Sequence, residues 1–383
     1  MDSSYPPLDQ VRKSLRVKWY RCPIEREQLR ELSKRSDFRG WLQAGGHLAL
    51  FSSTGFLTYL FWSQELWLAC SVMLFAHGTI GSFFVGVAPH ELGHGTVFRT
   101  KWLNKIFLYL YSLLSWWDPF AYATSHTYHH RYTMYPDGDR ENLLPLEPSI
   151  SSLLAVQLFT VNLFTGQGRT FGKGGLISTI FATVKSACNI PDSTEIPIRE
   201  WLQALFNDQP SEQIKSRWWS RALLFFHSSI AALAIHTDLW VLPLLITIFP
   251  FIGNWGVYLV GLPQHCGLRD NDPDFRKCVR SMKLNPLSEF LYWHMNWHTE
   301  HHMYAGVPCY NLKKLYRELA NDMPTPRTLI GAWKEMRETW QRQQLDPYYQ
   351  FDTPLPKTAG DQHQEPTDEL EYSIGDLAPR GMK

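Results

Sequence analysis

The stretch of residues 66–94, LWLACSVMLFAHGTIGSFFVGVAPHELGH, joins a long uncharged run to a pair of histidines. Residues 66–88 contain no Asp, Glu, Lys or Arg. About 20 helical residues are enough to cross the hydrocarbon core of a bilayer. His90 and His94 follow the run at once, and residues four apart share one face of a helix. The stretch therefore predicts a membrane-spanning helix that presents two imidazoles at its end.

Two further histidine clusters have the same helical spacing. One contains His126, His129 and His130, and the other contains His298, His301 and His302. The spacing predicts that each cluster aims its imidazoles in one direction. Imidazole is a ligand for zinc, copper, iron and nickel. The three clusters together offer more ligands than the roughly four that a zinc ion takes, so we expect two metal ions held between helices.

Further apolar segments complete the membrane pattern. Residues 42–62, 222–236 and 239–262 are all uncharged. We predict spans at about 42–62, 66–88, 220–237 and 239–262, paired in two hairpins. The short links within the hairpins contain no Lys or Arg, whereas ten basic residues lie between Arg12 and Arg39. The positive-inside rule then places this basic arm, and with it all three histidine clusters, on the cytoplasmic face.

The predicted fold is an all-α integral membrane protein with four transmembrane helices in two hairpins and a cytoplasmic helical cap that holds a di-metal site. Residues 1–40 form a basic cytoplasmic arm. Residues 41–344 form the main domain, with the cap in residues 89–217 and 263–344. Residues 345–383 are rich in Pro, Asp, Gln and Gly and are predicted to be disordered. The apolar segments 106–117 and 152–165 are too short to span and are predicted to be interfacial helices.

Composition excludes some classes of protein and of site. Lys+Arg total 37 and Asp+Glu total 36, so the chain lacks the basic excess of a nucleic-acid-binding protein. Its six cysteines form no C-x-x-C pair, which argues against a disulfide framework and a thiolate metal site. No basic-then-apolar signal sequence opens the chain, so membrane insertion is expected to rest on internal segments.

Several motifs allow more than one interpretation. His90-Glu91-Leu-Gly-His94 matches the H-E-x-x-H helix of a zinc protease, in which Glu91 would be the general base, but that interpretation leaves the other two clusters unexplained. His265, just after the last predicted span, is either a ninth ligand or an ordinary interfacial residue. We predict Glu91 and Glu300 as hydrogen-bond partners behind the ligands, and His294 in the same role. His227 lies within a predicted span and is assigned no chemistry.

The three clusters resemble the histidine boxes of the membrane fatty acid desaturase and hydroxylase superfamily. The family pattern is H-x(3–4)-H, then H-x(2–3)-H-H, then H/Q-x(2–3)-H-H, and the three clusters of this chain match it in order. The resemblance covers roughly residues 40–320. Within the family, the segment Asn-Trp-His-Thr-Glu-His-His around His298 is similar to that of acyl-lipid and sphingolipid-type members. The family's additional histidine before the third box is matched by His265.

This resemblance implies a non-haem di-iron centre with O₂ as co-substrate. The implied ligands are His90, His94, His126, His129, His130, His265, His298, His301 and His302. The implied reaction inserts a C=C bond into a fatty acyl chain or a related lipid-like metabolite, and a hydroxylase of the same superfamily is the alternative.

A fused cytochrome b5 domain would carry a His-Pro-Gly-Gly segment, which is absent, so electrons are expected from a separate cytochrome b5 or ferredoxin and its reductase. In a eukaryotic host the endoplasmic reticulum is the expected location. A membrane scaffold without catalytic activity is a further alternative.

Overall fold

The computed structural model describes residues 5–148, 150–164, 174–196 and 198–360. Within these ranges the regular secondary structure is helical, apart from one pair of two-residue strands and two isolated β-bridges. The α-helices are α1 (Leu8–Ser14), α2 (Arg26–Leu32), α3 (Asp37–Gly40), α4 (Gly46–Ser63), α5 (Trp67–Ser82), α6 (Val87–Gly93), α7 (Lys101–Leu114), α8 (Pro119–Tyr132), α9 (Ser152–Phe159), α10 (Leu176–Ala187), α11 (Arg199–Asp208), α12 (Pro210–Thr237), α13 (Val241–Pro243), α14 (Trp255–Gly261), α15 (Phe275–Cys278), α16 (Pro286–Leu291), α17 (His298–Met303), α18 (Cys309–Leu319) and α19 (Leu329–Gln343). Strands β1 (Met282–Lys283) and β2 (Arg327–Thr328) pair in parallel.

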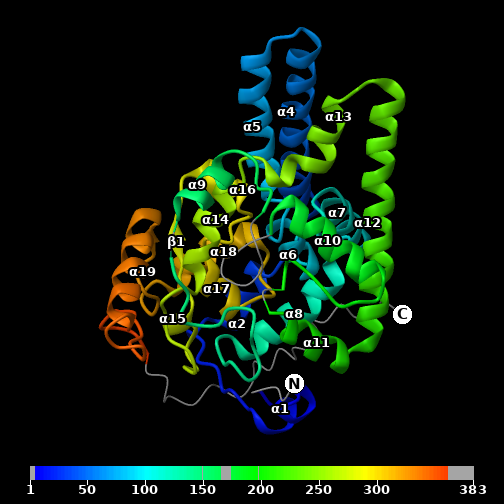
Figure 1. Ribbon diagram of the computed structural model, residues 1–383. Coiled ribbons are helices and arrows are strands. Elements are labelled where there is room, and N and C mark those ends of the chain that lie inside the picture. The colour runs from blue at the N-terminus through cyan, green and yellow to red at the C-terminus, as the bar shows by residue number, and fades with distance from the viewer. Residues whose placement is uncertain (1–4, 149, 165–173, 197, 361–383) are drawn as a thin grey trace.

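Helices α4 and α5 form a hairpin that projects from the body of the molecule (Figure 1). A π-helical turn, Trp41–Gly45, leads into α4, so the first predicted span is helical almost throughout. The hairpin carries exposed apolar side chains, among them Phe56 and Leu68, which are 60% and 81% exposed. Within the described residues, one helical run, Trp67–Gly93, is long and apolar enough to cross a bilayer.

The second projecting limb differs from its prediction. Helix α12 covers the predicted span 220–237, but residues 239–262 do not form one helix. This segment runs through α13, a π-helical turn (Leu244–Ile248) and a 3-10 turn (Phe249–Phe251) before α14 begins. The break has a local cause, because Pro243 and Pro250 cannot donate backbone hydrogen bonds and Gly253 has a φ of +57°. His77 from α5 lies 3.0 Å from the carbonyl oxygen of Leu245 and satisfies one of the backbone groups that the break leaves.

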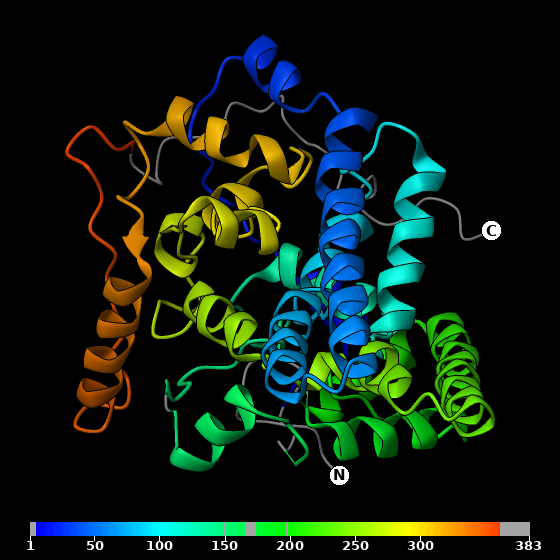
Figure 2. The same cartoon turned by 90° about the horizontal axis from the view of Figure 1, so that it is seen from above.

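The remaining helices form a body below the two limbs. Seen from above, the α4–α5 hairpin stands near the middle, α12 lies at one edge and α19 lies on the opposite flank (Figure 2). The main core is aromatic and includes Phe84, Tyr111 and Trp293, all essentially inaccessible to solvent. Helix α7, which covers most of the segment predicted as interfacial, contributes Tyr111 to this core and exposes Ile106.

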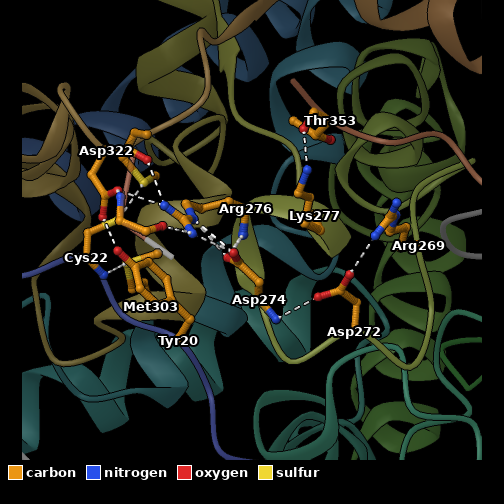
Figure 3. Close-up of polar contacts among 12 residues, drawn as sticks. Tyr20, Cys22, Arg269, Asp272, Asp274, Arg276, Lys277, Met303, Asp322 and Thr353 are labelled. Atoms are coloured by element: carbon orange, nitrogen blue, oxygen red, sulfur yellow. Dashed lines mark hydrogen bonds and ion pairs between the residues drawn. The ribbon is translucent and has the colours of Figure 1, made fainter. Parts of the chain in front are cut away.

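A buried arginine ties both ends of the described chain to the body (Figure 3). Arg276 pairs with Asp274 and Asp322 at 2.7 Å each, and its guanidinium lies 3.9 Å from the ring centroid of Tyr20. It also donates to the carbonyl oxygen of Gly360 at 3.0 Å.

Part of the segment predicted to be disordered is therefore held against the body. Asp352 pairs with Lys277 at 2.6 Å, next to the Arg276 network, and Gly360 bonds to Asp322 through its amide at 2.5 Å. Within the segment predicted to be disordered, Asp352 and Gly360 are thus bound by charged and backbone groups of the body. The rest of that prediction, residues 361–383, lies outside the described residues.

Candidate metal centre

Helices α6 and α8 start at positions fixed by their local sequence. Gly86 has a φ of +73° and allows the chain to turn from α5 into α6, which carries His90. Asp118 caps α8, because its side chain accepts hydrogen bonds from the amides of Phe120 and Ala121 at 2.9 and 3.2 Å. Pro119 occupies the first turn, where its missing N–H costs nothing. These residues fix the first residue of each helix, and therefore the positions of the histidines of the first two clusters.

The structure brings all nine predicted ligands together in two groups. The first group consists of His90, His94, His126, His130 and His301. The second group consists of His129, His265, His298 and His302. Within each group the nitrogen atoms that could act as ligands lie within 4.8 Å of one another, and the rings are buried or half-buried. His265, which the sequence left open between two roles, belongs to the second group.

The nitrogen spacings fit metal ions at the centres of these groups. In the first group, His94 Nε2 lies 3.3 Å from His126 Nε2, and His130 Nε2 lies 3.2 Å from His301 Nε2. In the second group, His298 Nε2 lies 3.1 Å from both His265 Nε2 and His302 Nε2. An ion about 2.1 Å from each nitrogen would separate neighbouring nitrogens by roughly 3.0–3.4 Å. His90 Nε2 is buried without a hydrogen-bond partner among the described residues, as expected of an atom that awaits an ion.

The second and third clusters each serve both groups, which corrects the prediction that every cluster points one way. On α8, His126 and His130 face the first group and His129 faces the second. On α17, His298 and His302 face the second group and His301 faces the first. Successive residues on an α-helix lie about 100° apart, so residues four apart are offset by about 40° and residues three apart by about 60° in the other direction. In both helices the two histidines four apart face one group, and the histidine three from the first of them faces the other group. Helices α8 and α17 therefore lie between the two groups.

Three rings of the second group, those of His129, His302 and His265, have a hydrogen-bond partner at Nδ1, the ring nitrogen that faces away from the centre of the group. His129 Nδ1 lies 2.8 Å from Asp139 Oδ2, and His302 Nδ1 lies 3.1 Å from Thr133 Oγ1. His265 Nδ1 donates to the carbonyl oxygen of Cys278 at 3.0 Å. A partner at Nδ1 fixes the ring orientation and the tautomer, so that Nε2 faces the centre of the group with its lone pair.

Carboxylates and a phenol support the first group in the same way. Glu91 Oε1 lies 3.0 Å from His90 Nδ1, within hydrogen-bond distance, and 3.6 Å from His301 Nδ1, which has no hydrogen-bond partner among the described residues. Tyr122 approaches His126 Nδ1 with its hydroxyl at 3.3 Å, and Glu141 lies 3.9 Å from the same nitrogen. Glu91 thus stands where the sequence predicted it.

Eight of the nine rings have a lowered pKa, which favours the neutral form that binds a metal. Burial, followed by repulsion from neighbouring imidazoles, lowers the pKa of His126, His298 and His302 well below the ordinary value, so these rings are neutral near pH 7. Burial also opposes charge on His129, but the Asp139 carboxylate outweighs it and raises the pKa of His129. The same pairing lowers the pKa of Asp139 against the effect of burial, so this carboxylate is ionised.

The sequence analysis did not predict every residue that hydrogen-bonds a ligand ring, and two residues that it did predict in this role, Glu300 and His294, have other hydrogen-bond partners. Asp139 is not among the residues predicted from the sequence, although a carboxylate ten residues after His129 is a usable signal. Glu300 accepts a hydrogen bond from Ser281 at 2.5 Å, and His294 lies 3.3 Å from Glu289. His227 lies outside both groups, where its ring stacks on Trp116 with centroids 3.8 Å apart.

Comparison with known proteins gave one family match. The model of the fatty acid desaturase family matches residues 65–332, which is more than half of the chain and includes all nine histidines. A search of curated proteins found no match. Since this match spans α5 to α19 and encloses both histidine groups, the chain belongs to the fatty acid desaturase family.

Proposed function

We propose that this protein is an O₂-dependent desaturase that inserts a C=C bond into a fatty acyl chain or a related lipid-like metabolite. The overall reaction converts –CH₂–CH₂– to –CH=CH–, with O₂, two electrons and two protons yielding two waters. Family membership supports the reaction class. The observation that carries the proposal is the pair of imidazole groups, because groups of four and five imidazole donors suit two ions rather than one. Hydroxylation, which uses the same co-substrate and electrons and adds one oxygen, is the second candidate within the family.

Two bound iron ions would supply the oxidising power needed to break an unactivated C–H bond. The protein's own contribution is placement. Asp139, Thr133 and the Cys278 carbonyl hold three rings of the second group by Nδ1. Glu91 holds His90 of the first group in the same way. Burial of the rings keeps bulk water from the place where hydrogen would be removed.

The zinc-protease alternative gains no support from the position of Glu91. A general base must reach the water on the metal, which lies on the Nε2 side of His90 in this arrangement. Glu91 Oε1 is instead bonded to Nδ1 on the opposite side of that ring. The carboxylate is therefore a support for ligands and not a base beside the ion.

We also propose that the protein is a multi-pass membrane protein whose two limbs enter the bilayer. The α4–α5 hairpin and the α12–α13 limb rise from the same side of the molecule (Figure 1). Exposed apolar residues on both, such as Leu68 and Phe225, which are 81% and 77% exposed, favour lipid contact. The histidine groups would then lie on the cytoplasmic side, at the endoplasmic reticulum in a eukaryote. Electrons would come from a separate cytochrome b5 or ferredoxin with its reductase.

Metal analysis combined with product analysis tests the proposal. Purified protein is expected to hold about two iron ions per chain, and a lipid-fed, desaturase-free host is expected to accumulate products that lack two hydrogens. Gain of one oxygen would favour the hydroxylase, and one zinc without iron would refute the di-iron centre. His301→Ala is expected to abolish turnover and reduce iron. The matched control His227→Ala removes a buried histidine that lies outside both groups and should leave the iron content unchanged.

A further inference from the structure

Two aromatic side chains outside the histidine groups contact ligand rings within the described part of the chain. Tyr122 stacks on His126 with ring centroids 5.0 Å apart, and the ring centroid of Phe275 lies 5.7 Å from that of His302. Tyr122 also contacts the buried Trp117, which packs against the turn between α5 and α6. The contact of Tyr122 therefore leads toward the α4–α5 hairpin.

Phe275 connects the second histidine group to a tryptophan that reaches the surface. The Trp19 ring stacks on the Phe275 ring with a centroid distance of 4.1 Å and an interplanar angle of 9°. Phe275 is 1% exposed, whereas Trp19 is half-buried. Only one ring thus separates Trp19 from His302. Electron transfer falls off steeply with distance, so a stack of rings in van der Waals contact conducts electrons better than a solvent-filled gap of the same length.

Backbone hydrogen bonds hold this stack in place from two sides. Trp19 donates through Nε1 to the carbonyl oxygen of Arg131 at 3.0 Å, and Tyr135 packs edge-on against the Trp19 ring with centroids 5.8 Å apart. The amide of Tyr20 donates to the carbonyl oxygen of Pro273 at 2.9 Å. Because Pro273 lies two residues before the stacked phenylalanine, this bond fixes the two segments of the stack relative to each other.

The outer end of the stack faces away from the projecting limbs. Trp19 lies between α1 and α2, and Figure 1 places α1 and α15 in the half of the body remote from the α4–α5 hairpin. Insertion of the hairpin into a bilayer would leave this half in water. Residues 15–22 contain no acidic side chain, and Arg16 and Lys18 are exposed on either side of Val17. Positive charge beside Trp19 favours a partner with an acidic surface.

We propose that Trp19 and Phe275 form the path by which electrons enter the second histidine group, and that an acidic one-electron carrier protein docks over Trp19. In each encounter the carrier loses one electron and a ferric ion held by the histidines becomes ferrous, with no bond formed or broken. Two encounters reduce two ions. Electron-transfer partners bury little surface, so a few charges around one ring are enough to orient the carrier. The need for electrons rests on the proposed function, whereas docking does not.

Docking is tested on the full-length protein, with or without iron. The probes are the soluble haem domain of cytochrome b5 and a plant-type ferredoxin, and biolayer interferometry measures their association rates. Lys18→Glu is expected to slow association of the faster probe by about tenfold at low salt and less at high salt, because steering charges act on association. The control Lys101→Glu makes the same charge change at an exposed position of α7 and should bind like the wild type. Equal rates for the two variants, or no binding of either probe, would overturn the docking surface.

Oxidation of the donor tests the path itself. The reduced probe is mixed anaerobically with oxidised, iron-loaded protein without acyl substrate, and the absorbance of the probe reports the electrons transferred. At saturating probe, Trp19→Leu and Phe275→Leu should each lose most of the fast phase, whereas Trp19→Phe keeps a ring in the stack and should retain it. The control Tyr316→Leu removes a ring that stacks on Trp297 and contacts no ligand ring, and should behave like the wild type. A fast phase in Trp19→Leu equal to that of the wild type, at equal iron content, would overturn the path.

The path and the proposed desaturase function fail in different ways. If the probe is oxidised by the wild type and not by Trp19→Leu, but no acyl product forms when lipid and O₂ are added, the desaturase proposal fails and the path stands. If acyl products form and Trp19→Leu oxidises the probe at the wild-type rate, the path fails and the desaturase proposal stands.

Discussion

Asp139 shows how much a single carboxylate contributes to the predicted centre. Its Oδ2 lies 2.8 Å from His129 Nδ1 and also accepts a hydrogen bond from the amide of Met134 at 2.9 Å. The carboxylate is therefore held in place by the backbone that follows α8, and the carboxylate orients the imidazole ring of His129. Because Nδ1 keeps its proton in this pair, the lone pair of His129 lies on Nε2, which faces His302 Nε2 at 3.2 Å.

Replacing this carboxylate with an amide should weaken metal binding. Asp139→Asn keeps an oxygen near His129 but removes the negative charge that increases the basicity of the ring. We expect metal affinity to fall by about 10-fold to 100-fold, measured as iron retained per chain after dialysis against graded chelator. Asp137→Asn, an exposed residue of the same turn, is the matched control. Equal iron retention by the two variants would contradict the role of Asp139.

Glu289 makes a second residue-scale prediction, this time for pH. Burial alone would raise the pKa of Glu289, but hydrogen bonds from His294, Trp297 and Lys313 outweigh burial and lower it from the ordinary 4.5 to about 2. A depressed pKa contributes stability that is complete above the unfolded-state value and is lost as pH falls toward the folded-state value.

The stability advantage of the wild type over Glu289→Gln should therefore be constant above about pH 5 and shrink from about pH 4.5 toward pH 2. Thermal unfolding of both proteins between about pH 6 and pH 3 measures this difference. A difference that stays constant as the pH falls from 5 to 3 would show that the three hydrogen bonds do not control the titration of this carboxylate.

At the scale of elements, a short N-terminal segment, residues 19–22, contacts both helices that lie between the histidine groups. Trp19 donates through Nε1 to the carbonyl oxygen of Arg131 on α8 at 3.0 Å. Three residues later, Cys22 accepts a hydrogen bond from Tyr304 at 2.5 Å, directly after α17. Tyr20, between them, stacks against Arg276. This segment thus links α8, α17 and the buried arginine into one unit.

Arg276 should be essential to that unit. Arg276→Met leaves Asp274 and Asp322 without their buried partner, and breaking a buried ion pair from one side costs about 3–5 kcal/mol. Lys277→Met, the adjacent residue, removes an ion pair with the exposed Asp352 and should cost less than about 1 kcal/mol. Denaturant unfolding in detergent compares the two variants, and a similar loss in both would mean that the arginine is not the hub.

At the scale of the whole molecule, the two histidine groups join distant segments, and bound metal ions would cross-link these segments. The first group joins α6, α8 and α17, and the second joins α8, α17 and the segment after α14. No short segment contains a complete set of ligands, so the ions can bind fully only to the folded chain. Binding that is restricted to the folded state stabilises it.

Removing the metal should therefore lower the unfolding temperature. We expect treatment with a strong chelator to reduce it by about 5 °C or more, and ferrous iron to restore it. Differential scanning fluorimetry of treated, untreated and reconstituted protein provides the measurement. If the chelated protein has lost its iron and still unfolds at the same temperature, the groups do not cross-link the fold.

The sequence by itself determined the elements and the ligand types. Uncharged runs identified the apolar helices, and three- and four-residue spacing identified the histidines that the structure brings into two groups. Both are local properties, because helix geometry is set by neighbours in the chain. The sequence also contained the prolines that break residues 239–262, although hydrophobicity alone suggested one span.

Only the tertiary structure decided how the histidines divide between the groups and which side chains support them. His129 and His130 are adjacent but serve different groups, and Asp139, Thr133 and the Cys278 carbonyl reach the rings of the second group from separate turns. The contacts of residues 19–22 with α8 and with Tyr304 after α17 also join residues that are far apart in the sequence. Such contacts depend on how the helices are oriented relative to one another. Burial of the aromatic core sets this orientation. The spacing of residues within one helix contains no information about it.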